Sequence, residues 1–355
     1  MKKIRPYRKS SRKSSRKSSR KSSRKSSRKS SRKSSRKSSR KSSRKSSRKS
    51  SRKLSRKSSR KLSRKSSRKS IKSSSAKGDK DEIIMVSPKG RYFKYDIKLG
   101  KGSSKNVFRG FDTEDNRFVA WNEINTTKNK KEQNKKIVQE INLLKDLNSP
   151  YIMKFKGSWS DKSTRMIYFI TEMAEFTLKD WINKYHSKIS IDHINSYAYN
   201  ILKCIEYIHS KSIIHRDLKS ENIFMTFEDI CPRIFIGDFG ISSVKEKATS
   251  TVGTPEFMAP EMYVGNEYTN KVDMYAFGCI LLELYTYTTP YMECDSVTCV
   301  FKKVLAGILP LSIGMIKNNE KLKNIIKKLL STDPDKRPSA QELLKEGYFK
   351  PMLCT

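Results

Sequence analysis

The first 78 residues limit what this chain can fold into, because they contain almost nothing that a core could bury. From Arg8 to Ile71 the sequence repeats Arg-Lys-Ser-Ser through sixteen units, and only Leu54, Leu62 and Ile71 interrupt the pattern. This arm holds 37 of the 78 Lys and Arg residues and none of the 35 Asp and Glu residues. In a helix, a period of four would stack like charges on one face. We therefore expect the arm, residues 1–78, to be disordered.

The charge of the arm favours anionic partners. Dense positive charge suits nucleic-acid backbones, anionic membrane surfaces or acidic proteins, whereas the near absence of aromatic side chains argues against sequence-specific nucleic-acid binding. Each serine lies close to Arg or Lys, so the arm is also a candidate substrate for a kinase that selects basic sequences. Short basic clusters resemble nuclear import signals. A tolerated low-complexity expansion explains the composition equally well, and the role of the arm stays open.

The composition changes at Asp79, after which 35 acidic residues stand against 41 basic ones. We interpret residues 79–90 as a linker and residues 91–350 as one globular domain with a substantial core. The six cysteines form no C-x-x-C pair, and no His has metal-binding spacing, which indicates reduced thiols in a cytoplasmic or nuclear protein. No apolar segment follows the basic N-terminus, as a secretory signal requires. The longest apolar run, around Phe277 to Leu284, is far shorter than the ~20 residues of a transmembrane helix.

Three motifs indicate the chemistry. Residues 215–222 have the sequence His-Arg-Asp-Leu-Lys-Ser-Glu-Asn, residues 238–240 Asp-Phe-Gly, and residues 259–261 Ala-Pro-Glu. In this order and spacing they match the catalytic loop, the metal-binding turn and the end of the activation segment of protein kinases. The chain resembles that family over residues 90–350. The resemblance implies an α+β, bilobal protein-kinase fold, with a small β-rich N-terminal lobe and a larger helical C-terminal lobe behind the arm.

The resemblance also assigns roles. Phosphoryl transfer requires mainly positioning and neutralisation of charge. Asp217 should accept the proton of the substrate hydroxyl, and Asn222 and Asp238 should hold Mg²⁺ through oxygen ligands completed by ATP. Lys219 resembles the lysine that marks serine/threonine kinases and reaches the γ-phosphate. The expected activity is transfer from ATP to protein Ser or Thr hydroxyls.

The nucleotide site should begin at a glycine-rich hairpin. Residues 91–97 alternate as a strand does, and residues 100–107 have the sequence Gly-Lys-Gly-Ser-Ser-Lys-Asn-Val. This resembles the kinase pattern G-x-G-x-x-G-x-V without its third glycine. Backbone N–H groups in such a turn can approach phosphates. The hairpin residues expected at the nucleotide are Gly100, Gly102, Ser103, Ser104, Lys105 and Val107.

The strand lysine of kinases is missing. Residues 119–124 have the sequence Val-Ala-Trp-Asn-Glu-Ile, so neutral Asn122 stands where a Lys usually holds the α- and β-phosphates. One interpretation is a pseudokinase scaffold that the basic arm tethers to anionic partners. Lys105 supports another interpretation, since residues two apart share a strand face and Val107 should pack on adenine. Its long stem could bring the ammonium to the phosphates from the roof of the site. A solvated Lys105 on an exposed turn would leave the lost glycine and the lost lysine unexplained.

This exchange resembles the WNK (with-no-lysine) kinases, and residues 90–97 and 253–263 resemble that family as well. The resemblance implies that Lys105 is the catalytic lysine and that Glu140 is the glutamate of the αC helix. Ser250 matches the family's main activating phosphosite, with Thr251 as a neighbouring alternative, so both are candidates for autophosphorylation. Family members act on other kinases, which implies downstream kinases as substrates. The further nucleotide-binding residues implied are Ala120, the gatekeeper Thr171, and the hinge residues Glu172, Met173 and Ala174.

Several positions depart from the WNK pattern. Family members have Cys at the position of Asn122. At the position of Phe239, beside their inhibitory chloride site, they typically have Leu. The bulkier Phe239 leaves chloride sensing open. Glu246 replaces a second serine and carries a fixed negative charge. Elsewhere, Glu261 and Arg337 resemble a buried kinase ion pair, and Asp273 the residue that braces the catalytic loop.

Overall fold

The computed structural model describes residues 82–352, apart from 102–104, 128–130, 228–231, 240–242, 245–252 and 266. The arm predicted at residues 1–78 lies outside the described residues. All described residues belong to one unit, residues 75–355.

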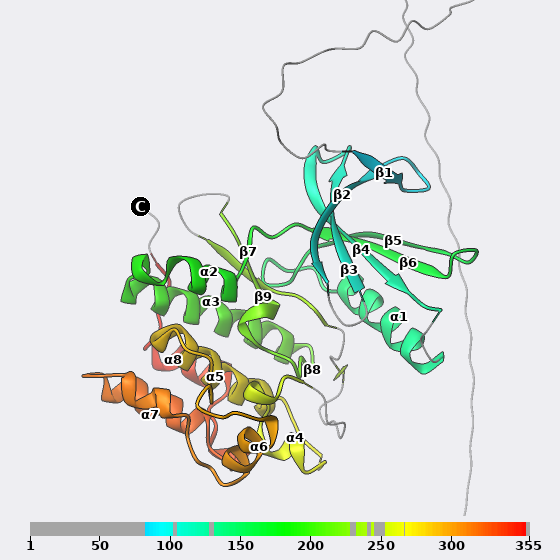
Figure 1. The fold of residues 1–355 in the computed structure, drawn as a ribbon. Coiled ribbons are helices and arrows are strands. Elements are labelled where there is room, and N and C mark those ends of the chain that lie inside the picture. Colours follow the sequence, from blue (N-terminus) through cyan, green and yellow to red (C-terminus); the bar gives the residue numbers. More distant parts are fainter. Residues whose placement is uncertain are drawn as a thin grey trace, which may run out of the picture. The chain divides into compact units, whose positions relative to one another are not determined.

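An antiparallel sheet forms the N-terminal part of this unit. Its strand order is β1-β2-β3-β4-β6-β5 (Figure 1). The strands are β1 (Ile83–Val86), β2 (Tyr92–Lys101), β3 (Lys105–Asp112), β4 (Arg117–Asn125), β5 (Phe155–Asp161) and β6 (Met166–Glu172). Side chains alternate across β4, so Val119 and Trp121 belong to a small core with Tyr92 and Tyr168, whereas Ala120 and Asn122 line a cavity on the opposite face.

The predicted linker contains the first strand. Residues 83–86 were assigned to a linker, but β1 pairs with β2, with Ile83 opposite Tyr95 and Val86 opposite Phe93. The run Ile-Ile-Met-Val has the apolar and β-branched character that favours strands. Ser87 then fixes the turn, because its Oγ accepts the N–H of Tyr92 at 2.9 Å.

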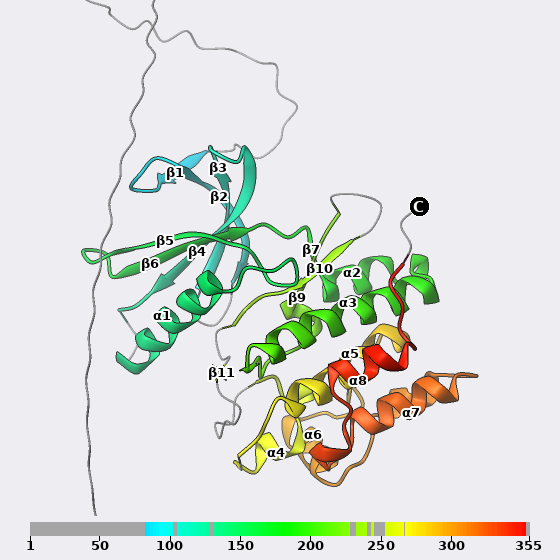
Figure 2. The same cartoon turned by 180° about the vertical axis from the view of Figure 1, so that it is seen from behind.

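Helices dominate the C-terminal part, as Figures 1 and 2 show. The α-helices are α1 (Lys131–Asp146), which belongs with the sheet, and α2 (Leu178–Tyr185), α3 (Ile191–Ser210), α4 (Pro260–Tyr263), α5 (Lys271–Thr286), α6 (Val297–Leu305), α7 (Glu320–Leu329) and α8 (Ala340–Glu346). Short 3-10 turns are η1 (His186–Lys188), η2 (Ser220–Asn222), η3 (Pro255–Phe257), η4 (Leu311–Met315) and η5 (Pro334–Lys336). Among the described residues, no helix is both long and apolar enough to cross a membrane.

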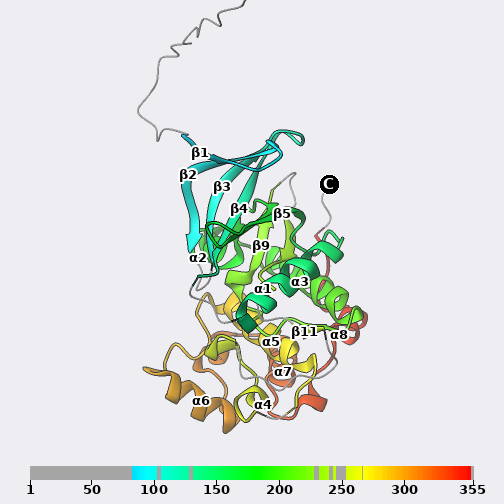
Figure 3. The same cartoon turned by 90° about the vertical axis from the view of Figure 1, so that its right-hand side faces the viewer.

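Two small sheets lie between the six-stranded sheet and the helices. One has the order β10-β9-β7, and the other pairs β11 with β8. Their strands are β7 (Phe176–Thr177), β8 (Ile213–Ile214), β9 (Ile223–Thr226), β10 (Arg233–Ile236) and β11 (Ser243–Val244). The strands β8 to β11 flank residues 215–222 and 238–239, which belong to the predicted motifs, and Figure 3 labels β9 and β11 among them.

Two helices explain how the core is organised. Helix α1 buries Ile137, Glu140, Ile141 and Leu144, which lie on one face because they are three or four residues apart. Helix α5 is buried on every side from Val272 to Leu284, as expected of a helix that is apolar all round. An N-terminal β-sheet followed by a helical part confirms the predicted α+β, bilobal kinase fold.

A buried ion pair ties the helical part together. Arg337 has no exposed surface and donates to both carboxylate oxygens of Glu261, at 2.6 and 2.8 Å. It also donates to the backbone carbonyls of Ser331 and Lys271. This confirms the predicted pair and links the segment after α7 to α4 and α5.

Candidate active site

A cavity of about 370 Å³ lies between the N-terminal sheet and the helical part. This volume suits a small-molecule ligand. Apolar side chains supply much of its wall, and polar ones gather at one end. The lining residues are Leu99, Gly100, Lys101, Lys105, Val107, Ala120, Asn122, Met153, Thr171, Glu172, Met173, Ala174, Glu175, Phe176, Thr177, Asp180, Glu221, Asn222, Phe224 and Asp238.

The lysine of β3 faces this cavity. Lys105 and Val107, two residues apart, both line it, and Val107 pairs with Asn122 across β3 and β4. The Nζ of Lys105 lies 2.9 Å from the Oδ1 of Asp238. Burial would lower the pKa of Lys105, but the charges of Asp238 and Glu140 outweigh this effect and raise it. The ammonium therefore stays charged in the cavity.

Asn122 occupies the usual lysine position without supplying charge. Its side chain is buried, and its Nδ2 donates to the carbonyl of Ala120 at 3.2 Å and to the hydroxyl of Thr171 at 3.5 Å. A neutral amide bound in this way leaves Lys105, which is half-buried, as the cation that faces Asp238 in the cavity.

The glutamate of α1 faces the same charges. Glu140 is 9% exposed, and its Oε1 has no hydrogen-bond partner among the described residues. Burial raises the pKa of Glu140 to about 7, although the charge of Lys105 opposes this. The ammonium of Lys105 is bonded to Asp238, so the ion pair with Glu140 that active kinases form is not made here.

The catalytic-loop residues converge on Asp217. Its Oδ1 accepts the hydroxyl of Thr254 at 2.8 Å, and its Oδ2 lies 3.3 Å from the Nζ of Lys219. Lys219 also donates to Thr254 at 2.6 Å. Asn222 donates its Nδ2 to the Oδ2 of Asp217 at 3.1 Å, which leaves the Oδ1 of Asn222 available as an oxygen ligand.

A carboxylate of α5 holds the loop in place. Asp273 accepts the backbone N–H groups of His215 and Arg216 at 3.0 and 2.9 Å, and the Nε2 of His209 lies 2.9 Å away. Burial alone would raise the pKa of Asp273, but these groups lower it, so the carboxylate is charged. Arg216 needs this support because its φ of 71° lies in the left-handed region. The predicted bracing role of Asp273 is confirmed.

The predicted metal-binding turn is fixed by its phenylalanine. Phe239 is buried and packs on the ring of His215, with 5.1 Å between centroids. Asp238 has a φ of 60°, which turns its carboxylate into the cavity next to Lys105. Burial would raise the pKa of Asp238, but Lys105 outweighs it and lowers the pKa.

Comparison with known proteins agrees with this geometry. The family model for the protein kinase domain matches residues 93–349. The chain belongs to the protein kinase family. It is 37% identical over 276 residues to serine/threonine-protein kinase WNK4 of Rattus norvegicus, covering 76% of this chain and 22% of the relative.

Two invertebrate WNK kinases are similar to this chain to about the same degree. Serine/threonine-protein kinase Wnk of Drosophila melanogaster is 37% identical over 282 residues, with 78% of this chain and 11% of the relative covered. Serine/threonine-protein kinase WNK of Caenorhabditis elegans is 36% identical over 282 residues, with 77% and 15% covered. The chain thus aligns with less than a quarter of the length of each of these relatives.

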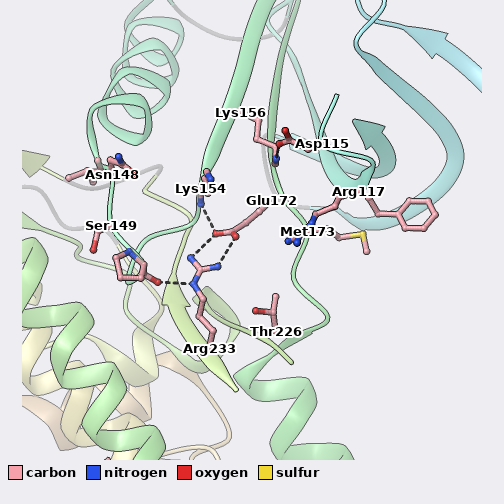
Figure 4. A pocket seen from close by; sticks show the side chains of 13 residues that line it. Asp115, Arg117, Asn148, Ser149, Lys154, Lys156, Glu172, Met173, Thr226 and Arg233 are labelled. Carbon is pink, nitrogen blue, oxygen red and sulfur yellow. Dashed lines mark hydrogen bonds and ion pairs between the residues drawn. The ribbon is translucent and has the colours of Figure 1, made fainter. Parts of the chain in front are cut away.

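The hinge of the kinase has a carboxylate on its far side. Glu172 accepts the backbone N–H of Lys154 at 2.7 Å and two N–H groups of Arg233 at 2.7 and 3.0 Å (Figure 4). Arg233 also donates to the carbonyl of Pro150. These bonds lie in a second cavity of about 630 Å³ behind the hinge. Glu172 was predicted to bind nucleotide, and with its carboxylate held here only its backbone can do so.

The kinase site fits ATP and Mg²⁺. Leu99, Val107, Ala120 and Phe224 supply apolar surface for a flat base, and Lys105 supplies charge for phosphates. Asn222 and Asp238 supply oxygen atoms, which suit Mg²⁺ when phosphate oxygens and water complete its shell. Gly102, Ser103 and Ser104, predicted at the phosphates, and the candidate phosphosites Ser250 and Thr251 lie outside the described residues.

Some site residues were not predicted from the sequence. Thr254 lies between Asp217 and Lys219, and its signal was the Gly-Thr-Pro-Glu sequence just before the Ala-Pro-Glu motif. Leu99 and Phe224 line the cavity from either lobe. Leu99 directly precedes the glycine-rich hairpin and Phe224 follows Asn222 by two residues on β9, so their places next to motifs were the available signals.

Proposed function

We propose that this chain is an active serine/threonine protein kinase of the WNK type, which uses Lys105 in place of the usual strand lysine. The observation that carries the proposal is the 2.9 Å contact between the ammonium of Lys105 and the carboxylate of Asp238 inside the cavity. It puts the cation of β3 beside the expected metal ligand, where the phosphates of a nucleotide would lie.

The residues on the acceptor side have separate roles. Asp217 orients the Ser or Thr hydroxyl and accepts its proton, because its carboxylate is partly exposed and bonds to Asn222, which lines the cavity. Lys219 and Thr254 hold that carboxylate and add positive charge beside it. Asn222 and Asp238 hold the metal ion, and Lys105 neutralises the α- and β-phosphates. The bound ATP·Mg²⁺ supplies the phosphoryl group itself.

The cavity also favours a class of acceptor sequence. Glu175, Asp180 and Glu221 line the cavity and are exposed, and Lys101 is the exposed cation in that lining, so the exposed lining carries net negative charge. Such charge favours acceptors with Lys or Arg nearby. Downstream kinases are proposed as substrates by the WNK resemblance. The serines of the arm and Ser250 or Thr251 are proposed as autophosphorylation sites.

The composition of the arm supports two further proposals, one on its binding partners and one on the cellular location of the protein. Its density of Lys and Arg suits nucleic acid, anionic membrane or acidic proteins as partners, and its short basic clusters suit a cytoplasmic or nuclear location. Binding to heparin should weaken steeply as salt rises and should be lost on removal of residues 1–78.

Phosphate transfer from radiolabelled ATP with Mg²⁺ to a basic protein tests the function. Wild type, Lys105→Met, Asp217→Ala and the control Lys98→Met are compared; Lys98 lies on β2, is exposed and does not line the cavity. Wild type and Lys98→Met should be active, and the other two should lose at least about 10²-fold. Full activity of Lys105→Met would show that another residue neutralises the phosphates. No transfer by wild type phosphorylated at Ser250, despite ATP binding, would favour the pseudokinase scaffold.

A further inference from the structure

Two cysteines on the helical part lie in direct contact, away from the nucleotide cavity. Cys294 lies in the loop between α5 and α6, and Cys299 lies in the first turn of α6. Their sulfur atoms are 2.7 Å apart. A disulfide bond is ~2.05 Å long, so the thiols are close to bonding distance. Both side chains are partly exposed, whereas Cys204 and Cys279 are fully buried.

The backbone on both sides fixes this contact. Ser296 caps α6, since its Oγ accepts the N–H of Cys299 at 3.3 Å. The N–H of Cys294 donates to the carbonyl of Tyr291 at 2.8 Å. The neighbouring Glu293 bonds to the ammonium of Lys303 at 2.8 Å. The loop and the first turn of α6 are therefore each anchored, and the two thiols face each other between them.

We propose that Cys294 and Cys299 form a reversible disulfide bond when the protein is exposed to hydrogen peroxide. The sulfur of one cysteine attacks a peroxide oxygen and becomes a sulfenic acid, and the other peroxide oxygen leaves as water. The second thiol then attacks the sulfenic sulfur and releases a second water. Two thiols and one peroxide thus give one disulfide and two waters; the cysteines lose two electrons and the peroxide gains them.

Proximity drives the second step. Burial and the adjacent Cys299 raise the pKa of Cys294 to about 11, so Cys294 is a neutral thiol at neutral pH and reacts slowly with an oxidant in solution. Once either sulfur is oxidised, closure of the bond is intramolecular, and a partner held in contact reacts far faster than a free one. The disulfide should therefore outcompete further oxidation to sulfinic acid.

The position of the bond gives it a structural consequence. Helix α6 packs against η3 and α4, which lie at the end of the predicted activation segment, around its Ala-Pro-Glu motif. Phe301 of α6 contacts the ring of Tyr263 in α4, with 5.1 Å between centroids. A disulfide would tie the first turn of α6 to the loop from α5, and so restrain the helix that supports this segment.

The test uses the full chain, treated with hydrogen peroxide, quenched and blocked with iodoacetamide. A protease that cleaves before Asp residues cuts at Asp295, which separates fragment 273–294 from fragment 295–332. The proposal predicts that the two fragments stay linked, weigh two hydrogens less than their sum, and separate after reduction with dithiothreitol. Tandem mass spectrometry assigns the link to Cys294 rather than Cys279, which shares its fragment.

A matched variant tests whether placement matters. Cys299→Ser with Thr298→Cys moves the thiol one position round α6 to an exposed site, and this variant should not form the link. The proposal is overturned if Cys294 and Cys299 of the peroxide-treated wild type are found alkylated or oxidised to sulfinic acid and the two fragments are not joined by a disulfide. This result does not depend on any substitution that could disturb folding. A disulfide that forms equally fast in the Thr298→Cys variant would also overturn the proposal. The native placement of Cys299 would then give no advantage in rate.

Discussion

The ammonium of Lys105 on β3 lies 2.9 Å from the carboxylate of Asp238, 133 positions later in the chain. The two residues come from the N-terminal sheet and from the loop after β10, so their contact spans both lobes. Asn122, the residue at the usual lysine position, is one strand away, opposite Val107. The proposed relocation of the catalytic lysine thus moves the cation from β4 to β3, where Lys105 lines the same cavity as Asn122.

This relocation predicts a rescue. Lys105→Met should lower phosphate transfer by about 10²–10³-fold, because one preorganised charge is lost. Adding Asn122→Lys should recover about tenfold, since the new ammonium enters the same cavity but a misplacement of about an ångström is costly. Lys105→Met with Asn122→Met is the matched control and should recover nothing. Steady-state transfer to a basic protein measures all three, and equal recovery by both double variants would contradict the relocation.

Thr254 should position Asp217. Its hydroxyl donates to Asp217 and accepts from Lys219, so removing it takes one hydrogen bond from each charged group, while Lys219 and Asn222 still contact the carboxylate. A hydrogen bond to a charged group contributes about 1.5–3 kcal/mol, so Thr254→Ala should lower kcat by about 10–100-fold. Thr254→Ser keeps the hydroxyl and should stay near wild type. The KM for ATP should be unchanged in both, and a large rise in it would show that Thr254 acts in nucleotide binding instead.

The sequence predicted the site residues that short motifs carry, and it missed contacts that only folding creates. His215 to Asn222 and Asp238 could be named because kinase chemistry needs those residue types in that order. Thr254 could not be assigned a role in the same way, because nothing local shows that residue 254 meets residue 217. The contact depends on the fold that brings Thr254, just before η3, to the catalytic loop.

Two other places were predicted only in part. The strand β1 lies within the predicted linker, although its four apolar residues favour a strand. Glu172 lines the cavity between the lobes, as expected of its place in the predicted hinge. Its carboxylate turns away to Arg233 of β10, and a sequence does not show which side of a hinge an arginine 61 positions away will occupy.

Gly278 should tolerate no side chain. A Cβ there would lie 2.8 Å from the Cβ of Leu329 and 3.1 Å from the Cδ2 of Leu330, where α5 packs on α7. Overpacking costs about 1–3 kcal/mol, and the better helix propensity of Ala returns about 1 kcal/mol. Gly278→Ala should thus lower the free energy of unfolding by up to about 2 kcal/mol in urea denaturation. Gly314→Ala, which meets open space, should change it by less than about 0.5 kcal/mol.

The pair of Glu261 and Arg337 should matter for folding more than for affinity. Arg337 is fully buried and makes two bonds to Glu261. Removing one partner leaves a buried charge uncompensated, so Arg337→Met should cost about 3–5 kcal/mol of unfolding free energy. The double variant Arg337→Met with Glu261→Leu should cost less than the sum of the single variants. Denaturant titration of the four proteins gives the coupling energy, and additive costs would mean that the pair is not coupled.

Asp112 should make the N-terminal sheet sensitive to acid. Burial alone would raise the pKa of Asp112, but two hydrogen bonds from Arg91, both 2.8 Å, and the N–H groups of Glu114 and Asp115 lower it to about 2. A carboxylate whose pKa is lowered on folding stabilises the protein above its unfolded pKa, and this stability disappears as the pH falls toward the folded value. Asp112→Asn should therefore be less stable than wild type by about 2 kcal/mol at pH 6. The difference should shrink between pH 4 and pH 3, measured by urea denaturation at each pH. A difference that stays constant down to pH 3 would mean that the charge of Asp112 adds nothing and that its loss acts only through packing.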